Sequence, residues 1–287
     1  MSTNMASAKK SGRSTEAPKK RFGRLLADFV AELGPQIVTE SGEWVVKGFI
    51  DTDQRIYMVS SDTKLISKIL EIHLLPHLFY FAKIHDYEMM LADHQNYYPD
   101  ITFIEDTGVK FALDFKTSYR LPNNPEHCNG FTLGSHGEYF IDRLSTKNIQ
   151  FPYSEYSGHF CLGIIYNRQE EQDAERPERY PIVEIDSIGS AIRDLELFVV
   201  EKWRIASDKR GSGNTANIGS IKHIGDMKAG KGMFHKLGEK WFDDYWVNYG
   251  KITSESDQPI KSLKDFVKYR GGDLSKVVEK RPPNRKK

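Results

Sequence analysis

Cysteine is scarce in this 287-residue sequence, where only Cys128 and Cys161 occur, far apart in the chain. Two thiols without metal-ligand spacing argue against a disulfide framework and against a zinc module. A protein of this kind fits a reducing compartment. We therefore expect it to be cytoplasmic.

A long hydrophobic run is also lacking. The most apolar stretch, residues 72–82, is interrupted by His73, Pro76 and His77, and it is shorter than the roughly 20 residues that cross a bilayer. The N-terminus is polar and basic, without the apolar segment of a secretory signal. These observations predict a protein without a membrane partner.

Neither sign of charge dominates, since 41 Lys and Arg residues stand against 40 Asp and Glu residues and the formal net charge is +1. A balanced total neither indicates nor excludes a nucleic-acid partner, so any basic surface for DNA must be local. The 39% of hydrophobic residues can supply a sizeable core.

Hydrophobic periodicity predicts one mixed α/β domain over residues 21–280, between a disordered basic tail at 1–20 and a basic C-terminal tail at 281–287. An N-cap is expected at Ser61-Asp62. The expected elements are helices over 22–33 and 63–75, a hairpin of strands over 44–50 and 56–59, strands over 101–105, 109–117, 160–166 and 182–185, and a helix or strand over 192–203.

The segment 100–117 carries the most informative pattern. Two β-rich runs flank the turn Asp106-Thr107-Gly108, which predicts a β-hairpin. Asp114 and Lys116 point to the same face of their strand because side chains alternate with period two. The hairpin returns Asp100 toward them. We therefore expect Asp100, Asp114 and Lys116 to converge.

Two carboxylates held close together repel each other unless a divalent cation neutralises them, and oxygen ligands without His or Cys favour Mg²⁺. Lys116 can hold a water molecule beside them or help to deprotonate it. Such a cluster has the parts for metal-assisted phosphodiester hydrolysis. Glu71, in an apolar helix, is a candidate third carboxylate. The alternatives are a solvated strand edge for Asp114 and Lys116, and a salt bridge or a helix surface for Glu71.

The loop 210–220 is a second candidate site. From Gly211 it matches G-x-G-x-x-A, but no apolar helix and no acidic residue follow in a βαβ context, so we reject a dinucleotide site. Glycines let a backbone approach base edges, Asn214 can bond adenine bidentately, and the Thr215 methyl group can meet a thymine methyl group. A flexible surface turn is the alternative. Charge for binding phosphates is expected from Lys202, Arg204, Lys209, Arg210 and Lys222.

The candidate residues and their order along the chain resemble those of the EcoRV-type type II restriction endonucleases of the PD-(D/E)xK superfamily. The resemblance covers most of the chain. Its motifs are Ser61-Asp-Thr-Lys64 before Glu71, Gln95-Asn96 before Tyr98-Pro-Asp100, Asp114-Phe-Lys116-Thr117, Phe131-Thr-Leu-Gly134, Thr146-Lys-Asn148, Gly211-Ser-Gly-Asn-Thr215 and Asn217-Ile-Gly-Ser220.

The resemblance implies a restriction-endonuclease-like fold, in which helices flank a central mixed β-sheet. It also implies a homodimer that cuts double-stranded DNA at a palindromic site with Mg²⁺ and leaves 5′-phosphate ends. The implied site is GATATC, cut bluntly at its centre. By the same resemblance, Asp100, Asp114 and Glu71 become metal ligands, and Lys116 orients the attacking water. The implied DNA contacts are Gln95, Asn96, Thr132, Lys147, Gly211, Ser212, Gly213, Asn214, Thr215 and Asn217.

Two other functions stay open at this point. One is a structure-selective repair nuclease with the same metal site and no base code. The other is a DNA-binding regulator that keeps the fold without turnover, although the intact Asp100, Asp114 and Lys116 speak against it.

Overall fold

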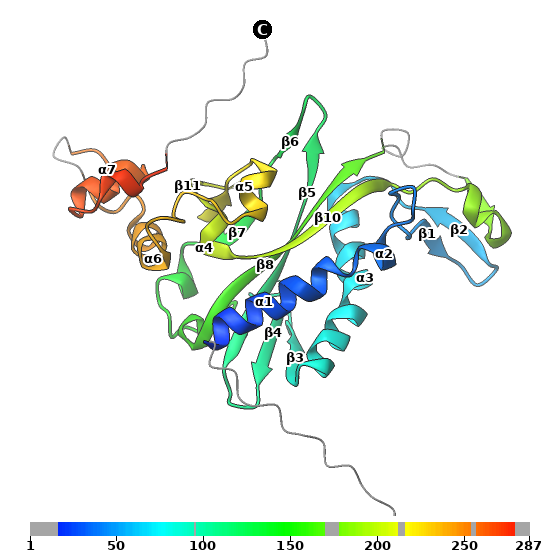
Figure 1. Ribbon diagram of the computed structural model, residues 1–287, viewed down its shortest axis with the longest axis horizontal. Helices are drawn as coiled ribbons and strands as arrows, with labels where there is room; N and C mark the ends of the chain where they lie inside the picture. The colour runs from blue at the N-terminus through cyan, green and yellow to red at the C-terminus, as the bar shows by residue number, and fades with distance from the viewer. Residues whose placement is uncertain (1–16, 95, 170–177, 212–215, 254–256, 279–287) are drawn as a thin grey trace, which may run out of the picture.

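The computed structural model describes residues 17–94, 96–169, 178–211, 216–253 and 257–278. Its centre is a six-stranded sheet in the order β10-β8-β5-β4-β3, with β6 paired to β5 (Figure 1). Strands β5 and β8 are parallel and the other neighbours are antiparallel, so the sheet is mixed, as expected. These strands are β3 Tyr87–Leu91, β4 Ile101–Glu105, β5 Lys110–Leu121, β6 Asn124–Cys128, β8 Tyr156–Arg168 and β10 Ile192–Glu201.

Two three-stranded sheets accompany the central one. The small sheet, in the order β1-β2-β9, stands at one end of the molecule (Figure 1, right), and the edge sheet, in the order β11-β12-β7, lies near α4 and α5. The small sheet consists of β1 Gly48–Ile50, β2 Arg55–Met58 and β9 Arg179–Pro181. The edge sheet consists of β7 Thr132–Ser135, β11 Ala206–Arg210 and β12 Asn217–Ser220.

Helices cover both faces of the central sheet. They are α1 Pro18–Ala31, α2 Gly34–Ile37, α3 Thr63–Ile84, α4 Lys202–Ile205, α5 Ile224–Lys228, α6 Glu239–Asn248 and α7 Leu263–Tyr269. Short 3-10 turns are η1 Glu138–Phe140, η2 Tyr153–Glu155, η4 Ile182–Ser187 and η5 Leu274–Lys276.

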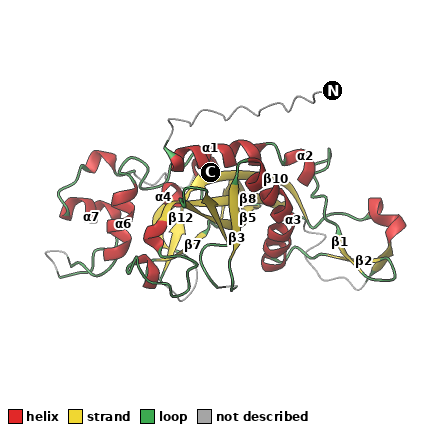
Figure 2. Ribbon diagram, turned by 90° about the horizontal axis from the view of Figure 1, so that it is seen from below, coloured by secondary structure: helices red, strands yellow, loops and turns green. Residues whose placement is uncertain are grey.

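The alternation of side chains along β5 separates two hydrophobic cores. Phe111, Leu113 and Phe115 point into the core shared with α1 and α3, whereas Ala112 points into the core shared with the edge sheet and α5 to α7. Figure 2 shows α1 lying along one side of the sheet. Asp114 and Lys116 have the parity of Ala112, so they lie on the side of the sheet away from α1.

Helix α1 is amphipathic, with Phe22, Leu26 and Val30 buried at a spacing of four residues. The Phe22 ring stacks on Phe111 of the central strand, with centroids 4.3 Å apart. The helix begins at Pro18, a residue that favours the first turn, rather than at residue 22. Residues 18–20, which we assigned to the tail, are therefore helical.

Helix α3 begins where the sequence predicts, because the Asp62 carboxylate accepts hydrogen bonds from Lys64 N and Leu65 N at 3.0 Å each. It continues through Pro76 to Ile84, beyond the expected end at residue 75. Burial of side chains past the proline, such as Phe81, compensates for the missing backbone hydrogen bond. Among the described residues, α3 alone is long and apolar enough to cross a membrane, but much of its apolar side packs in the core.

Two further expectations concern the elements at residues 182–185 and 192–203. The strand expected at 182–185 is wrong, because Ile182–Ser187 forms a 3-10 turn after Pro181 and leaves Val183 85% exposed. The type of 192–203, which we left open, is now clear: strand β10 runs to Glu201 and the short helix α4 follows.

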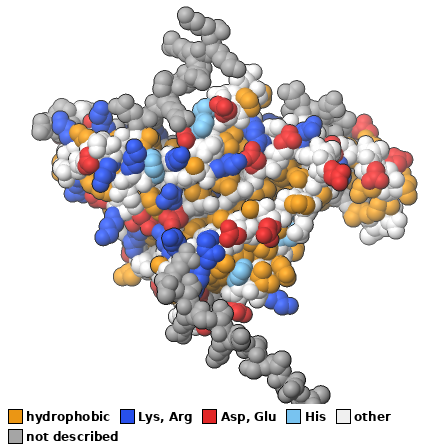
Figure 3. All heavy atoms as spheres, in the orientation of Figure 1, with side chains coloured by type: hydrophobic (Ala, Val, Ile, Leu, Met, Phe, Trp, Pro, Cys, Tyr) orange, Lys and Arg blue, Asp and Glu red, His pale blue; other side chains and the backbone are white. Residues whose placement is uncertain are grey.

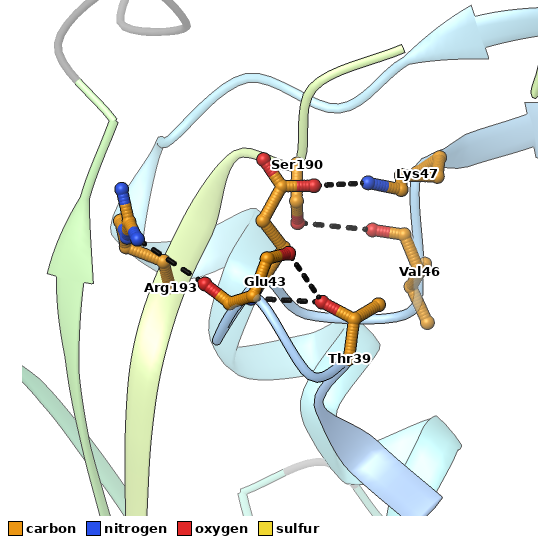
Figure 4. A network of polar contacts seen from close by, with 7 residues as sticks. Thr39, Glu43, Val46, Lys47, Ser190 and Arg193 are labelled. Carbon is orange, nitrogen blue, oxygen red and sulfur yellow. Dashed lines mark hydrogen bonds and ion pairs between the residues drawn. The ribbon is translucent and has the colours of Figure 1, made fainter. Parts of the chain in front are cut away.

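Polar contacts join the segment before β1 to the start of β10 (Figure 4). Within that segment Glu43 N donates to Thr39 Oγ1 at 3.2 Å, and across to the residues before β10 the Ser190 hydroxyl donates to the Val46 carbonyl at 3.4 Å. Arg193 pairs with Glu43 in an isolated β-bridge. These contacts attach the chain that enters the small sheet to the central sheet.

Candidate active site

The hairpin expected at 100–117 is confirmed. Strands β4 and β5 are antiparallel, with Ile101 opposite Leu113. Gly108 has φ of +82°, the left-handed conformation that glycine adopts readily, and its N–H donates to the Glu105 carbonyl at 2.8 Å to close the turn. This register places Asp100 next to Asp114.

Asp100, Asp114 and Lys116 converge as predicted. Lys116 Nζ lies 2.6 Å from Asp114 Oδ2, so these neighbours on one face of β5 form an ion pair. Phe115 N donates to Asp100 Oδ2 at 2.7 Å, which ties the Asp100 carboxylate to the same strand. The Asp114 side chain is close enough to act electrostatically on the Asp100 carboxyl group.

Burial and mutual repulsion define the electrostatics of this cluster. Burial, and next the charge of Asp114, raise the pKa of Asp100 to about 7, although Lys116 opposes them. Burial tends to lower the pKa of Lys116, but Asp114 and Asp100 outweigh it and raise that pKa above its usual range. The site therefore holds two carboxyl groups and only one adjacent ammonium group to balance them.

This carboxylate pair fits a divalent cation. A pair whose repulsion is strong enough to raise a pKa gains from a cation between its members, and both groups offer hard oxygen ligands. No cluster of three His, Cys, Asp or Glu side chains suited to a metal occurs in the part of the chain that the structure describes. Mg²⁺ does not require one, because it commonly binds one or two carboxylates together with water and substrate phosphate.

Glu71 does not join the carboxylate pair in this structure. It lies on α3, where Lys68 Nζ is 2.6 Å from its Oε1. This is the salt bridge that the sequence left open as an alternative. Its role as a third metal ligand stays a prediction.

Three of the expected DNA contacts meet at the edge sheet. Thr132 begins β7, Asn217 begins β12, and Gly211 N donates to the Asn217 carbonyl at 2.9 Å, which closes the base of the 211–217 loop. A Cβ atom at Gly211 would lie 3.3 Å from Thr132 Oγ1, so glycine permits this close approach. Outside the described residues lie Gln95, Ser212, Gly213, Asn214 and Thr215.

Two further expected contacts flank the Tyr98-Pro99-Asp100 segment. Asn96 is exposed just before it. The side chain of Lys147 is 71% exposed, with Nζ 3.2 Å from Glu138 Oε1. Tyr98 N donates to the Asn148 carbonyl at 3.1 Å, so the turn that carries Lys147 lies beside the entry to Asp100.

The expected phosphate-binding residues divide into two groups. Lys209, Arg210 and Lys222 are exposed and Arg204 is half-buried. Lys202 is only 1% exposed, so its expected contact with phosphate from solvent is wrong. Helix α4 turns Lys202 into the core on the side of the sheet that carries Asp114. The only sequence signal is that Lys202 follows the apolar run Leu197–Val200 and precedes Trp203 and Ile205.

Comparison with known proteins agrees with this arrangement. The family model described as restriction endonuclease EcoRV matches residues 40–271. The type II restriction enzyme EcoRV of Escherichia coli is 34% identical over 237 residues, which cover 81% of this chain and 94% of that enzyme. The chain belongs to the EcoRV restriction endonuclease family. Membership confirms the endonuclease predicted from the sequence and the restriction-endonuclease-like fold.

Membership in the EcoRV family also bears on the cofactor and the substrate. Enzymes of this kind generally depend on divalent metal ions, which agrees with the paired Asp100 and Asp114. Restriction endonucleases act on double-stranded DNA. The residues that the family model matches include both the β4–β5 hairpin and the edge sheet. Both candidate sites therefore lie in the part of the chain that the family shares.

The raised pKa of Asp100 predicts a pH-dependent stability difference. The unfolded carboxyl group ionises near pH 4 and the folded one near pH 7, so its ionisation costs folding free energy that grows between these values. Asp100→Asn should therefore be more stable than the wild type at pH 8, by roughly 2–4 kcal/mol. The gain should disappear as the pH falls to 4. Urea unfolding at both pH values measures it, and an equal difference at both would contradict the assignment.

Proposed function

We propose that this protein is a type II restriction endonuclease that hydrolyses double-stranded DNA at a palindromic site with Mg²⁺ and leaves 5′-phosphate ends. The proposed site is GATATC, cut bluntly at its centre, because the reading loop resembles that of EcoRV-type enzymes. The observation that carries the proposal is the convergence of Asp100, Asp114 and Lys116 on one face of the central hairpin.

The roles of these residues follow from their placement. Asp100 and Asp114 would hold the cation, which when bound supplies Lewis-acid activation of the phosphate and acidifies water. Lys116 is fixed by Asp114 at 2.6 Å and stays protonated, so it can orient a water molecule and stabilise negative charge on the phosphate.

Sequence discrimination is assigned to a different part of the molecule. Gly211, Asn214 and Thr215 are proposed to read base edges in the major groove. The closed base of the loop, formed by Gly211 and Asn217 beside Thr132, supports this role because it fixes where the loop leaves the edge sheet. The exposed Lys209, one residue before Arg210, is placed to contact phosphate.

A homodimer is proposed because a palindrome is matched by two-fold protein symmetry. The small sheet offers a surface for the second copy: Figure 3 shows hydrophobic side chains gathered at that end of the molecule. This apolar patch consists of Phe49, Ile50, Tyr57, Ile182, Val183 and Ile185, each at least 38% exposed. Exposed apolar patches commonly mark protein interfaces. We place the protein in the cytoplasm, in keeping with its two free thiols.

The first test of function removes a carboxylate. Asp100→Ala should lower DNA cleavage with Mg²⁺ by about three orders of magnitude or more, since losing a metal ligand removes several kcal/mol of transition-state stabilisation. DNA binding should stay measurable by gel shift. Asp106→Ala, in the turn of the same hairpin, is the control and should cleave normally. A wild-type rate in Asp100→Ala would refute the metal site. The wild-type protein should cut plasmid DNA into discrete fragments, whereas a smear of fragments would favour the structure-selective repair nuclease.

The reading loop predicts a loss of discrimination. Asn214→Ala should weaken the preference for the cognate duplex by about 1–3 kcal/mol per half-site, the usual value of a bidentate base contact. Lys209→Ala is the control, because loss of a phosphate contact should weaken binding to all sequences alike. Competition between cognate and altered duplexes measures both. Equal weakening for all duplexes in Asn214→Ala would make the loop a phosphate clamp instead.

The apolar patch predicts a change in oligomeric state. Val183→Asp places a charge at a position that is 85% exposed in one chain, so the fold should survive while the dimer dissociates about 100-fold more readily. Leu144→Asp, at a 76% exposed position outside the patch, is the matched control. Sedimentation at micromolar concentration measures the effect. A fully dimeric Val183→Asp would exclude Val183 from the interface.

A further inference from the structure

Lys202 is a buried cation without a polar partner in the described part of the chain. Its side chain is 1% exposed and its Nζ atom has no hydrogen-bond partner there. The ammonium group instead lies over aromatic rings, 4.8 Å from the centroid of Tyr98, 5.5 Å from Tyr153 and 5.7 Å from Phe140. We call these three rings the aromatic cage.

The position of Lys202 costs stability. Burial lowers its pKa to about 8, and this outweighs the attraction of Asp114. The group is therefore charged at pH 7 although its surroundings disfavour the charge. Buried charges of this kind can often be replaced by apolar side chains of similar volume with no loss of stability, or with a gain. Core packing alone does not account for a lysine here.

The cage connects Lys202 to the first carboxylate. Tyr98 stands two residues before Asp100, and its ring stacks on Tyr139, with centroids 5.6 Å apart. Tyr98 Oη shares a 2.8 Å hydrogen bond with the buried His159. The Tyr98 ring is thus fixed from several sides, and Lys202 caps it through a cation–π contact.

The charge of Lys202 connects it to the second carboxylate. Asp114 is the strongest electrostatic influence on Lys202 after burial, ahead of Cys161, Lys116 and Asp243. A Cβ atom at Gly134 would lie 3.6 Å from Lys202 Nζ, in ordinary van der Waals contact, so strand β7 passes close to the ammonium group. Lys202 therefore acts on Asp100 through the Tyr98 ring and on Asp114 through its field.

We propose that Lys202 is a positioning residue for DNA cleavage, a buried second cation that holds Tyr98-Pro99-Asp100 and Asp114 in the geometry required for catalysis. With Lys116 it gives the two carboxylates two counter-charges, one at the site and one inside the protein. The inference rests on the proposed metal site, because it concerns the placement of that site's carboxylates.

The test replaces the ammonium group and keeps the stem. Lys202→Met should raise the midpoint of thermal unfolding by about 2 °C or more, since a buried charge is lost. At saturating Mg²⁺ it should slow single-turnover cleavage at least about tenfold, whereas affinity for uncut duplex DNA should stay within about twofold. A lysine needed only for structure would instead lower the midpoint. Lys202→Arg keeps the charge and should recover most of the cleavage rate.

A second lysine provides a matched control. Lys110 begins β5 and, like Lys202, places its Nζ atom 4.8 Å from an aromatic centroid, here that of Phe151, but it pairs with Glu155 at 2.8 Å. Lys110→Met removes a cation–π lysine away from the carboxylates. It should cleave at the wild-type rate and should not become more stable.

A further measurement is made on the wild-type protein, and a variant serves only to assign the signal. The ammonium resonance of Lys202, assigned by its absence in Lys202→Arg, should shift when Ca²⁺ or Mg²⁺ is added to the DNA-free protein, and that of Lys110 should not. Three results for Lys202→Met would each overturn the proposal: cleavage at the wild-type rate, a lowered unfolding midpoint, or failure to fold. The proposal would also be overturned if the Lys202 resonance of the wild type did not move although calorimetry showed that the metal binds. If no metal binds to the wild type, or if Asp100→Ala cleaves normally, the proposed function itself fails.

Discussion

The ion pair between Asp114 and Lys116 is the interaction on which the site depends. Both residues lie on β5, which the flanking strands β4 and β8 enclose, so a carboxylate that is only 6% exposed has its counter-charge two residues away at 2.6 Å. Without Lys116, two adjacent carboxylates would face the interior with no cation beside them, an arrangement that proteins rarely sustain. The strand therefore supplies the counter-charge of Asp114 itself.

Strand β5 also separates the side chains that pack in the core from the side chains of the candidate active site. One face of β5 presents Phe111, Leu113 and Phe115 to α1 and α3, and the other presents Asp114 and Lys116. Because the period of a strand is two, a slip of one residue would exchange these faces. The stack of Phe22 on Phe111 opposes such a slip, so packing on one side keeps the charged residues on the other.

The local part of this arrangement could be predicted from the sequence. The turn 106–108, the two flanking strands and the alternation of Asp114, Phe115 and Lys116 are encoded within a single hairpin, and the structure confirms them. Lys202 could not be placed in this way. Its neighbours Tyr98, Phe140 and Tyr153 come from three distant segments, and periodicity carries no information about contacts between distant segments.

The wrong strand at 182–185 and the extended helix α3 have the same origin. In both, an apolar run was interpreted by its own pattern, and tertiary surroundings decided the outcome. Ile182–Ser187 follows β9 at the edge of the small sheet, where no strand among the described residues pairs with it, and Val183 is exposed to solvent. In α3, the core formed by Leu74, Leu78 and Phe81 continues across Pro76, so the helix continues as well.

The loss of stability caused by the buried charges of the site is offset by the aromatic core on the same side of the central sheet. Burial disfavours the charges of both Asp100 and Lys202, since it raises the pKa of the carboxyl group and lowers that of the amine. Large aromatic side chains lie near both residues: Asp100 stands two residues after Tyr98, and Lys202 lies over Tyr98, Tyr153 and Phe140. Rigid rings lose little conformational entropy on burial and fix positions well. The aromatic core therefore gives the central sheet enough stability and rigidity to hold charges that alone would destabilise it.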